Sequence, residues 1–143
     1  MSQDTKELTI LLVEDDEIDA TSIQRSFNKQ KLANTIIRAH DGMEALELLQ
    51  NKEVPRPFII LLDLQMPRMN GLEFLGHLRK DPELTDSIVF ILTTSKADRD
   101  LVESYSNHVA GYFVKDEVGT NFIDVVTVLG SYWKIVHLPD KTR

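Results

Sequence analysis

Carboxylate side chains directly follow two apolar runs of the sequence. Glu14, Asp15 and Asp16 come after the run that ends at Val13, and Asp63 comes after a later run. Carboxylates this close together repel one another unless something relieves the charge. A bound cation would do so, and a few carboxylates with waters are ligands that suit Mg²⁺. A carboxylate beside a bound metal ion can also attack phosphorus and form an aspartyl phosphate.

A hydroxyl group and an amino group follow two further apolar runs. Thr93 comes directly after Ile88–Leu92, and Lys115 comes directly after Val109–Val114. A lysine can neutralise phosphoryl oxygens as a point charge, and a hydroxyl can hydrogen-bond to another of these oxygens. Phosphoryl transfer requires mainly positioning and neutralisation of charge. Together with the acids, these two residues indicate phosphoryl transfer to a carboxylate.

Alternating strands and helices must bring these residues together. Five apolar runs predict strands, over Leu8–Val13, Thr35–Ala39, Phe58–Leu62, Ile88–Leu92 and Val109–Val114. Five amphipathic segments predict helices, over Glu17–Lys29, Glu44–Gln50, Gly71–Lys80, Asp98–Ser106 and Asn121–Val136. This alternation predicts an α/β fold, a doubly wound five-stranded parallel sheet with helices on both faces.

The predicted sheet would gather the polar residues at one edge. A doubly wound sheet binds its ligands beyond the carboxyl ends of its strands, and the acids, the threonine and the lysine all stand there. The four consecutive acids, Glu14–Glu17, have a simpler explanation when they are taken alone. Negative charge is also favourable at the N-terminus of a helix, because of the helix dipole.

The composition excludes several other classes of protein. The chain has 143 residues, which fits one domain, and its net charge of −7 argues against a nucleic-acid-binding surface. It has no cysteine, which excludes disulfides and cysteine-based metal sites. No apolar run approaches the roughly 20 residues of a membrane helix, and the polar start lacks the apolar core of a signal peptide. We therefore expect a cytoplasmic protein without membrane contact.

Five segments of the chain resemble the receiver domain of response regulators, which has a flavodoxin-like fold. They are "ILLVEDD", "RAHDGMEALELL", "IILLDLQMPRMNGLEFL", "VFILTTS" and "GYFVK". The resemblance implies a receiver domain over residues 8–133, with a disordered tail at 1–7 and an extension at 134–143. It also implies a stand-alone two-component regulator that takes a phosphoryl group from a histidine kinase and switches a protein–protein interaction surface.

The resemblance assigns the acids separate roles. It implies that Asp63 is the phosphoacceptor and that Mg²⁺ is bound by Glu14, Asp15, Asp63 and the backbone carbonyl of Gln65. Asp16 lies just past the matched acidic pair, and we expect it to begin the helix instead.

Three further residues receive roles through the same resemblance. Thr93 and Lys115 would stabilise the phosphoryl group. Thr93 and Tyr112 would act as the switch that responds to it, although Tyr112 has an equal claim to plain packing. Such a protein is not an enzyme acting on external substrates, because it catalyses only its own phosphorylation and dephosphorylation.

A narrower resemblance extends to the C-terminus. The segments "PRPFIILLDL", "ILTTSKADRDLVESYSNHVAGY" and "SYWKIVHLP" are similar to single-domain regulators partnered with bacterial phytochrome kinases. This implies a bacteriophytochrome as the kinase and an aromatic extension used in dimers, with Tyr132, Trp133 and Val136 as interface candidates. The downstream protein partner stays open.

One departure from the family pattern keeps an alternative open. Asp116 follows Lys115, where receivers usually have a proline with a cis peptide bond. A cis bond before another residue costs roughly 3 kcal/mol, so we expect a trans bond there. Asp116 can also compete for the Lys115 ammonium group. The alternative is therefore a pseudo-receiver, an interaction module that is not phosphorylated.

Two other functions fit the sequence less well. A phosphatase of the haloacid dehalogenase type would need a second acid two residues after its nucleophile, where this chain has Gln65. A flavodoxin-like cofactor binder would need a small, hydroxyl-rich phosphate loop after the first strand. Carboxylates stand there instead, and they would repel a phosphate group.

Overall fold

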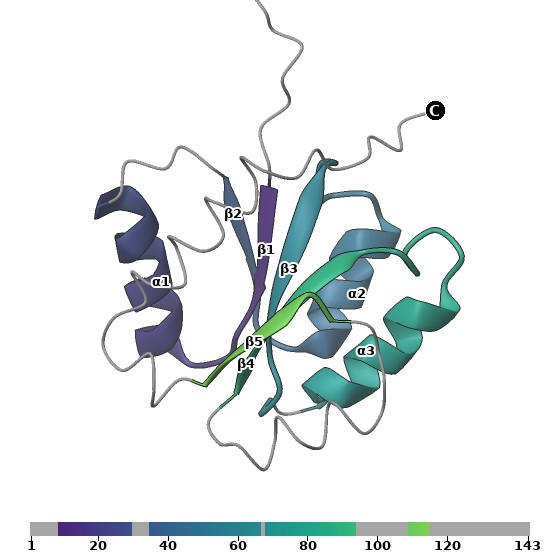
Figure 1. Cartoon of the computed structure of the whole chain (residues 1–143). Helices are drawn as coiled ribbons and strands as arrows, with labels where there is room; N and C mark the ends of the chain where they lie inside the picture. Colours follow the sequence, from purple (N-terminus) through teal and green to yellow (C-terminus); the bar gives the residue numbers. More distant parts are fainter. Residues whose placement is uncertain (1–8, 30–34, 67, 94–108, 115–143) are drawn as a thin grey trace, which may run out of the picture.

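A five-stranded parallel sheet forms the centre of the molecule (Figure 1). The computed structural model describes residues 9–29, 35–66, 68–93 and 109–114. The strands are β1 (Thr9–Val13), β2 (Ile36–Ala39), β3 (Phe58–Asp63), β4 (Ile88–Thr93) and β5 (Gly111–Val114). All neighbouring strands are parallel, in the order β2-β1-β3-β4-β5. The predicted fold class is confirmed.

The strand order places the switch point of the topology between β1 and β3. The chain moves from β1 outward to β2, then returns past β1 to β3 and continues toward the other edge. In doubly wound sheets, ligands bind in the crevice at this point, beyond the carboxyl ends of the strands. Val13 pairs with Leu62 in the register of the two strands. Glu14 and Asp63, the next residues along, therefore lie side by side at the switch point.

Three helices in the described part of the chain cover the two faces of the sheet. They are α1 (Glu17–Lys29), α2 (Gly42–Gln50) and α3 (Gly71–Lys80). Figure 1 shows α1 on one side of the sheet, with α2 and α3 on the other. The further helices predicted over Asp98–Ser106 and Asn121–Val136 lie outside the described residues. None of the described helices is long and apolar enough to cross a membrane.

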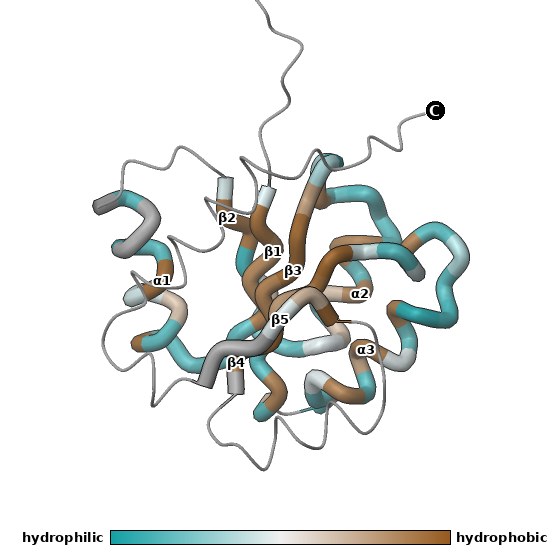
Figure 2. Tube along the Cα trace, in the orientation of Figure 1, coloured by the Kyte–Doolittle hydropathy of each residue, from teal (hydrophilic) through white to brown (hydrophobic). Residues whose placement is uncertain are grey.

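The two faces bury alternate residues of the strands. One buried cluster joins α2 and α3 to the sheet, and its strand members include Leu11, Val13, Ile60, Leu62, Val89 and Ile91. The residues between them in β1 and β3, which are Ile10, Leu12, Ile59 and Leu61, are also buried. Successive side chains of a strand point to opposite faces, so this second set faces α1. Figure 2 shows the resulting apolar band along the central strands.

Element boundaries differ from the prediction in five of the described elements. β2 begins at Ile36 and β4 ends at Thr93, each one residue later than predicted. β3 includes Asp63, so the acid is the last residue of the strand instead of the first residue after it. α2 begins at Gly42, two residues earlier than predicted, because the side chain of Asp41 accepts a hydrogen bond from the Glu44 N–H and caps the helix. β5 begins at Gly111, although the Ala110 N–H still bonds to the carbonyl of Val89 at 2.7 Å.

Candidate functional site

Three carboxylates meet at the switch point of the sheet. One oxygen atom from each of Glu14, Asp15 and Asp63 lies within 4.8 Å of the other two. Glu14 is 0% exposed and Asp63 is 2% exposed, whereas Asp15 is exposed. The predicted convergence of these acids is therefore present in the structure. Two of the charges are sheltered from solvent, and the third leaves one side of the cluster open.

Hydrogen bonds from nearby backbone N–H groups orient the two buried carboxylates. Oε2 of Glu14 accepts from the N–H of Asp16 at 3.2 Å, and Oδ1 of Asp63 accepts from the N–H of Gln65 at 3.3 Å. Each carboxylate is thus turned toward the loop that leaves its own strand. Both loops start at the same edge of the sheet, so the two side chains are directed to a shared space above it.

Asp16 has a different role from its neighbours. Its Oδ1 accepts from the N–H of Asp19 at 2.9 Å, and its carbonyl accepts from the N–H of Ala20 at 3.0 Å. This is the hydrogen bonding of a residue that caps a helix N-terminus. The expectation that Asp16 begins the helix is confirmed.

The donor set fits a hard divalent cation. All three groups offer carboxylate oxygens, which are the ligands preferred by Mg²⁺ and related ions. Their negative charges would repel one another less with a cation among them. The exposed side at Asp15 also leaves room for the waters that Mg²⁺ usually retains. The carbonyl of Gln65 was predicted as a further ligand. Gln65 is exposed and lies two residues after Asp63, in the loop that follows β3.

The remaining predicted site residues are placed only in part. Thr93 is the last residue of β4. The residue before it, Leu92, pairs with Asp63, so the backbone of Thr93 lies at the same sheet edge as the carboxylates. Tyr112 lies in β5 and pairs with Ile91. The other predicted residues, which are Lys115, Asp116, Tyr132, Trp133 and Val136, lie outside the described part of the chain.

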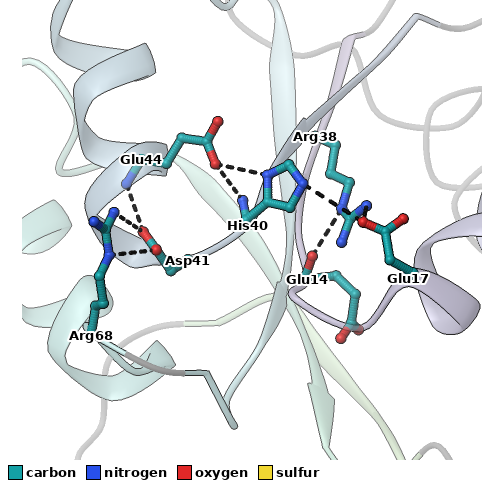
Figure 3. Close-up of polar contacts among 7 residues, drawn as sticks. All are labelled: Glu14, Glu17, Arg38, His40, Asp41, Glu44 and Arg68. Atoms are coloured by element: carbon teal, nitrogen blue, oxygen red, sulfur yellow. Dashed lines mark hydrogen bonds and ion pairs between the residues drawn. The ribbon is translucent and has the colours of Figure 1, made fainter.

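A second polar network, not predicted from the sequence, lies beside the carboxylates (Figure 3). Arg38 of β2 donates from Nε to the carbonyl of Glu14 at 3.0 Å and pairs through Nη1 with Glu17 at 2.9 Å. Its side chain is only 14% exposed. Arg38 thereby ties the end of β1 and the start of α1 to the neighbouring strand.

The other half of this network surrounds the N-terminus of α2. Arg68 donates two hydrogen bonds to Asp41, and this guanidinium holds the pKa of Asp41 below its usual range, although burial partly offsets the effect. Glu44 accepts from both the backbone N–H and Nδ1 of His40. Both bonds lower the pKa of Glu44, and the bond from the backbone N–H has the larger effect. The pattern Asp41-x-x-Glu44 could have signalled a capped helix, but the contact with Arg68 has no such signature.

Comparison with known proteins agrees with the fold. The family model of the response regulator receiver domain matches residues 10–127. Response regulator Rcp1 of Synechocystis sp. is 34% identical over 135 residues, which cover 91% of this chain and 92% of Rcp1.

Two solved structures are similar over almost the whole chain. The Mn²⁺-bound form of Rcp1 has a TM-score of 0.79 and 33% identity, with 94% of this chain and 100% of that chain covered. The phosphorylated cyanobacterial phytochrome response regulator RcpA has a TM-score of 0.81 and 30% identity, with the same coverage. The protein therefore belongs to the response regulator receiver domains, the phosphorylation-controlled modules of two-component signal transduction.

Proposed function

We propose that Asp63 accepts the phosphoryl group and that Glu14, Asp15 and Asp63, with the backbone carbonyl of Gln65, hold Mg²⁺. The observation that carries this proposal is the approach of the three carboxylates to within 4.8 Å at the switch point. Asp63 suits the acceptor role because it ends a central strand and its carboxylate is oriented by the Gln65 N–H. The related RcpA has been solved in a phosphorylated form.

The Mn²⁺-bound form of Rcp1 supports a divalent cation at this site. When bound, such an ion would offset the negative charge that otherwise keeps a phosphoryl group away from the carboxylates. The choice of Mg²⁺ rests on the hard oxygen donors and the open, hydrated side at Asp15.

The transfer itself breaks one bond and forms another. A carboxylate oxygen of Asp63 forms a bond to the phosphorus of a phosphohistidine, and the phosphorus–nitrogen bond of the donor breaks. The released imidazole nitrogen keeps the electron pair and takes up a proton from solvent. Thr93 and Lys115 then hydrogen-bond to the transferred phosphoryl oxygens, and Thr93 and Tyr112 pass the change to the protein surface. Such a protein acts in signalling and turns over no external substrate.

The similarity to Rcp1 and RcpA extends the proposal to the partners. We propose a bacteriophytochrome-type histidine kinase as the donor and a cytoplasmic setting, with output through a protein–protein surface instead of nucleic acid. The receiver would span residues 8–133, after a disordered tail at 1–7. The extension at 134–143, with Tyr132, Trp133 and Val136, would contribute to a homodimer.

Mass spectrometry of the intact protein tests the acceptor. The full chain is incubated with Mg²⁺ and either acetyl phosphate or a phosphorylated bacteriophytochrome kinase, beside an Asp63→Asn variant. We expect one phosphate adduct on the wild type and none on the variant. An adduct on Asp63→Asn would reject Asp63 as the acceptor.

The same experiment decides between the proposal and the pseudo-receiver. Absence of an adduct on the wild type with both donors would favour the pseudo-receiver. An Asp116→Pro variant restores the residue usual in receivers. An adduct on that variant alone would assign the loss of phosphorylation to Asp116.

A further inference from the structure

Arg68 joins the loop after Asp63 to a neighbouring helix. It lies between β3 and α3, and its guanidinium binds both carboxylate oxygens of Asp41, the residue that caps α2 (Figure 3). Nε lies 2.7 Å from Oδ2 and Nη2 lies 3.1 Å from Oδ1. A two-pronged contact of this kind fixes direction as well as distance. We call the Arg68–Asp41 contact the clamp.

The next residue along the loop is held by the same helix. The N–H of Gly42 donates to the carbonyl of Met69 at 3.2 Å. A Cβ atom on Gly42 would lie 2.9 Å from both that carbonyl oxygen and Cγ of Met69, so the two backbones are in direct contact. Two adjacent loop residues, Arg68 and Met69, therefore rest against the first turn of α2.

The base of the loop is the predicted metal site. Asp63 accepts from the Gln65 N–H, and the N–H of Gly71 donates to the carbonyl of Leu64 at 3.1 Å. The chain between Asp63 and Gly71 is thus a closed loop that starts at the phosphoacceptor. Its tip is held by the clamp, so the position of the tip limits the orientations available to residues at the base.

The anchor of the clamp is itself held by a hydrogen bond. Oδ1 of Asp41 also accepts from the N–H of Glu44 at 2.9 Å and so caps α2. The Asp41 side chain is 10% exposed.

Arg68 has a φ angle of 64°, a backbone conformation that residues other than glycine rarely adopt. A residue held in such a conformation needs support from its surroundings, and the clamp provides it.

We propose that the Arg68–Asp41 clamp positions the β3–α3 loop so that the Asp63 carboxylate and the Gln65 carbonyl are arranged for a divalent cation before it binds. This inference rests on the proposed metal site and goes beyond it. Without the clamp, the cation would have to order the loop as it binds, and this cost would reduce the affinity. Arg68 is therefore a positioning residue.

The charge of Arg68 makes the inference distinguishable from simple electrostatics. Removal of a positive charge near the carboxylates should strengthen cation binding if only charge matters. Loss of the clamp should weaken it. Arg68→Ala thus has opposite expected signs under the two explanations. Arg68→Lys keeps the charge but not the two-pronged geometry, so it should also bind more weakly if the clamp acts as proposed.

The test is calorimetric titration of the full-length, metal-free protein with Mn²⁺ and with Mg²⁺. We expect Arg68→Ala, Arg68→Lys and Asp41→Asn to weaken the affinity on the order of 10-fold, as for other residues that orient metal ligands. Asparagine also caps helices well, so Asp41→Asn keeps the cap and removes the ionic contact. The double variant should lose little more than either single variant, since the two residues act as one unit.

Arg56→Ala is the matched control. The Arg56 guanidinium donates to the backbone carbonyl of Glu83 at 2.9 Å and stacks on the ring of Phe58. Phe58 is the first residue of β3, so Arg56 lies at the opposite end of that strand from Asp63. We expect it to leave the metal affinity unchanged. Hydrogen exchange of the Gly42 and Gly71 amides gives a second readout. Both amides should exchange faster in the metal-free Arg68 variants and slow down when the metal is added.

The outcomes separate the inference from the function on which it rests. If the wild type binds Mn²⁺, Asp15→Asn weakens the binding, and the Arg68 variants bind like the wild type, the clamp inference is overturned and the metal site stands. Tighter binding by Arg68→Ala would also overturn it in favour of simple electrostatics. If the wild type binds no divalent cation, the proposed metal site fails and the inference fails with it.

Discussion

A Cβ atom on Gly71 would lie 2.7 Å from the Cα atom of Leu64. It would also lie 2.9 Å from the carbonyl oxygen of Asp63. The first residue of α3 is therefore in direct contact with the end of β3, and only glycine fits there without movement. This contact closes the loop that starts at the proposed phosphoacceptor, so the packing of one helix and the geometry of the site depend on the same residue.

Gly71→Ala should destabilise the protein by about 1–3 kcal/mol, as overpacking of a tight contact does. Gly76 of the same helix is the control, because no described atom outside its own stretch of helix lies within 4 Å of the position of its Cβ. Gly76→Ala should stabilise the protein by about 0.5–1 kcal/mol through helix propensity. Urea denaturation measures both. Equal stability of Gly71→Ala and the wild type would contradict the close contact.

Removal of one charge from the carboxylate cluster should have opposite effects with and without metal. Asp15→Asn relieves repulsion among three groups within 4.8 Å, so the metal-free variant should melt at a higher temperature than the metal-free wild type. Wild-type protein in Mg²⁺ at about 100 times its dissociation constant should gain about 2.7 kcal/mol. The variant should gain less at the same concentration. Thermal unfolding with EDTA and with Mg²⁺ measures both effects, and an equal gain would argue against Asp15 as a ligand.

The central strands and the carboxylate cluster were predictable for one physical reason. β1 and β3 are buried along their whole length, so their sequences are continuous apolar runs that are hard to mistake. Parallel strands then bring their carboxyl ends to one edge, which places Glu14 beside Asp63 without further information. The predicted end of β3 was still one residue too early, because β3 includes Asp63. An acid at the end of a strand looks the same in sequence as an acid just after it.

The network around α2 was not predictable in the same way. Arg68 and Asp41 are 27 residues apart, and Arg38 is 24 residues from Glu14. Contacts at such separations depend on how the folded chain brings distant segments together, and no local spacing indicates them. The role of Asp41 as the cap of α2 was not predicted.

Arg38 should stabilise the start of α1 through the backbone of Glu14. Arg38→Met keeps the apolar part of this mostly buried side chain and removes the donor to the Glu14 carbonyl. The expected loss is about 1 kcal/mol or more, because an acceptor loses its partner. Glu17→Gln leaves the carbonyl contact intact and removes the charge that pairs with Arg38 and, at 3.9 Å, with His40. This carboxylate is 74% exposed, so the effect should stay below about 1 kcal/mol. Chemical denaturation compares them, and equal losses would show that the ion pair, not the carbonyl contact, matters.

The clamp should also make stability depend on pH in acid. Arg68 lowers the pKa of Asp41 below its ordinary value of 3.8, so the folded carboxyl releases its proton more readily than the unfolded one. Its contribution is therefore present above about pH 4 and is lost as the pH falls through the lower, folded pKa. The stability difference between wild type and Asp41→Asn should be constant near neutral pH and shrink below pH 3.8.

Glu44 and Glu47 of α2 also act on Arg68, so the same comparison in an Arg68→Ala background isolates the clamp. An equally large shrinkage in that background would assign the effect to the cap of α2 instead.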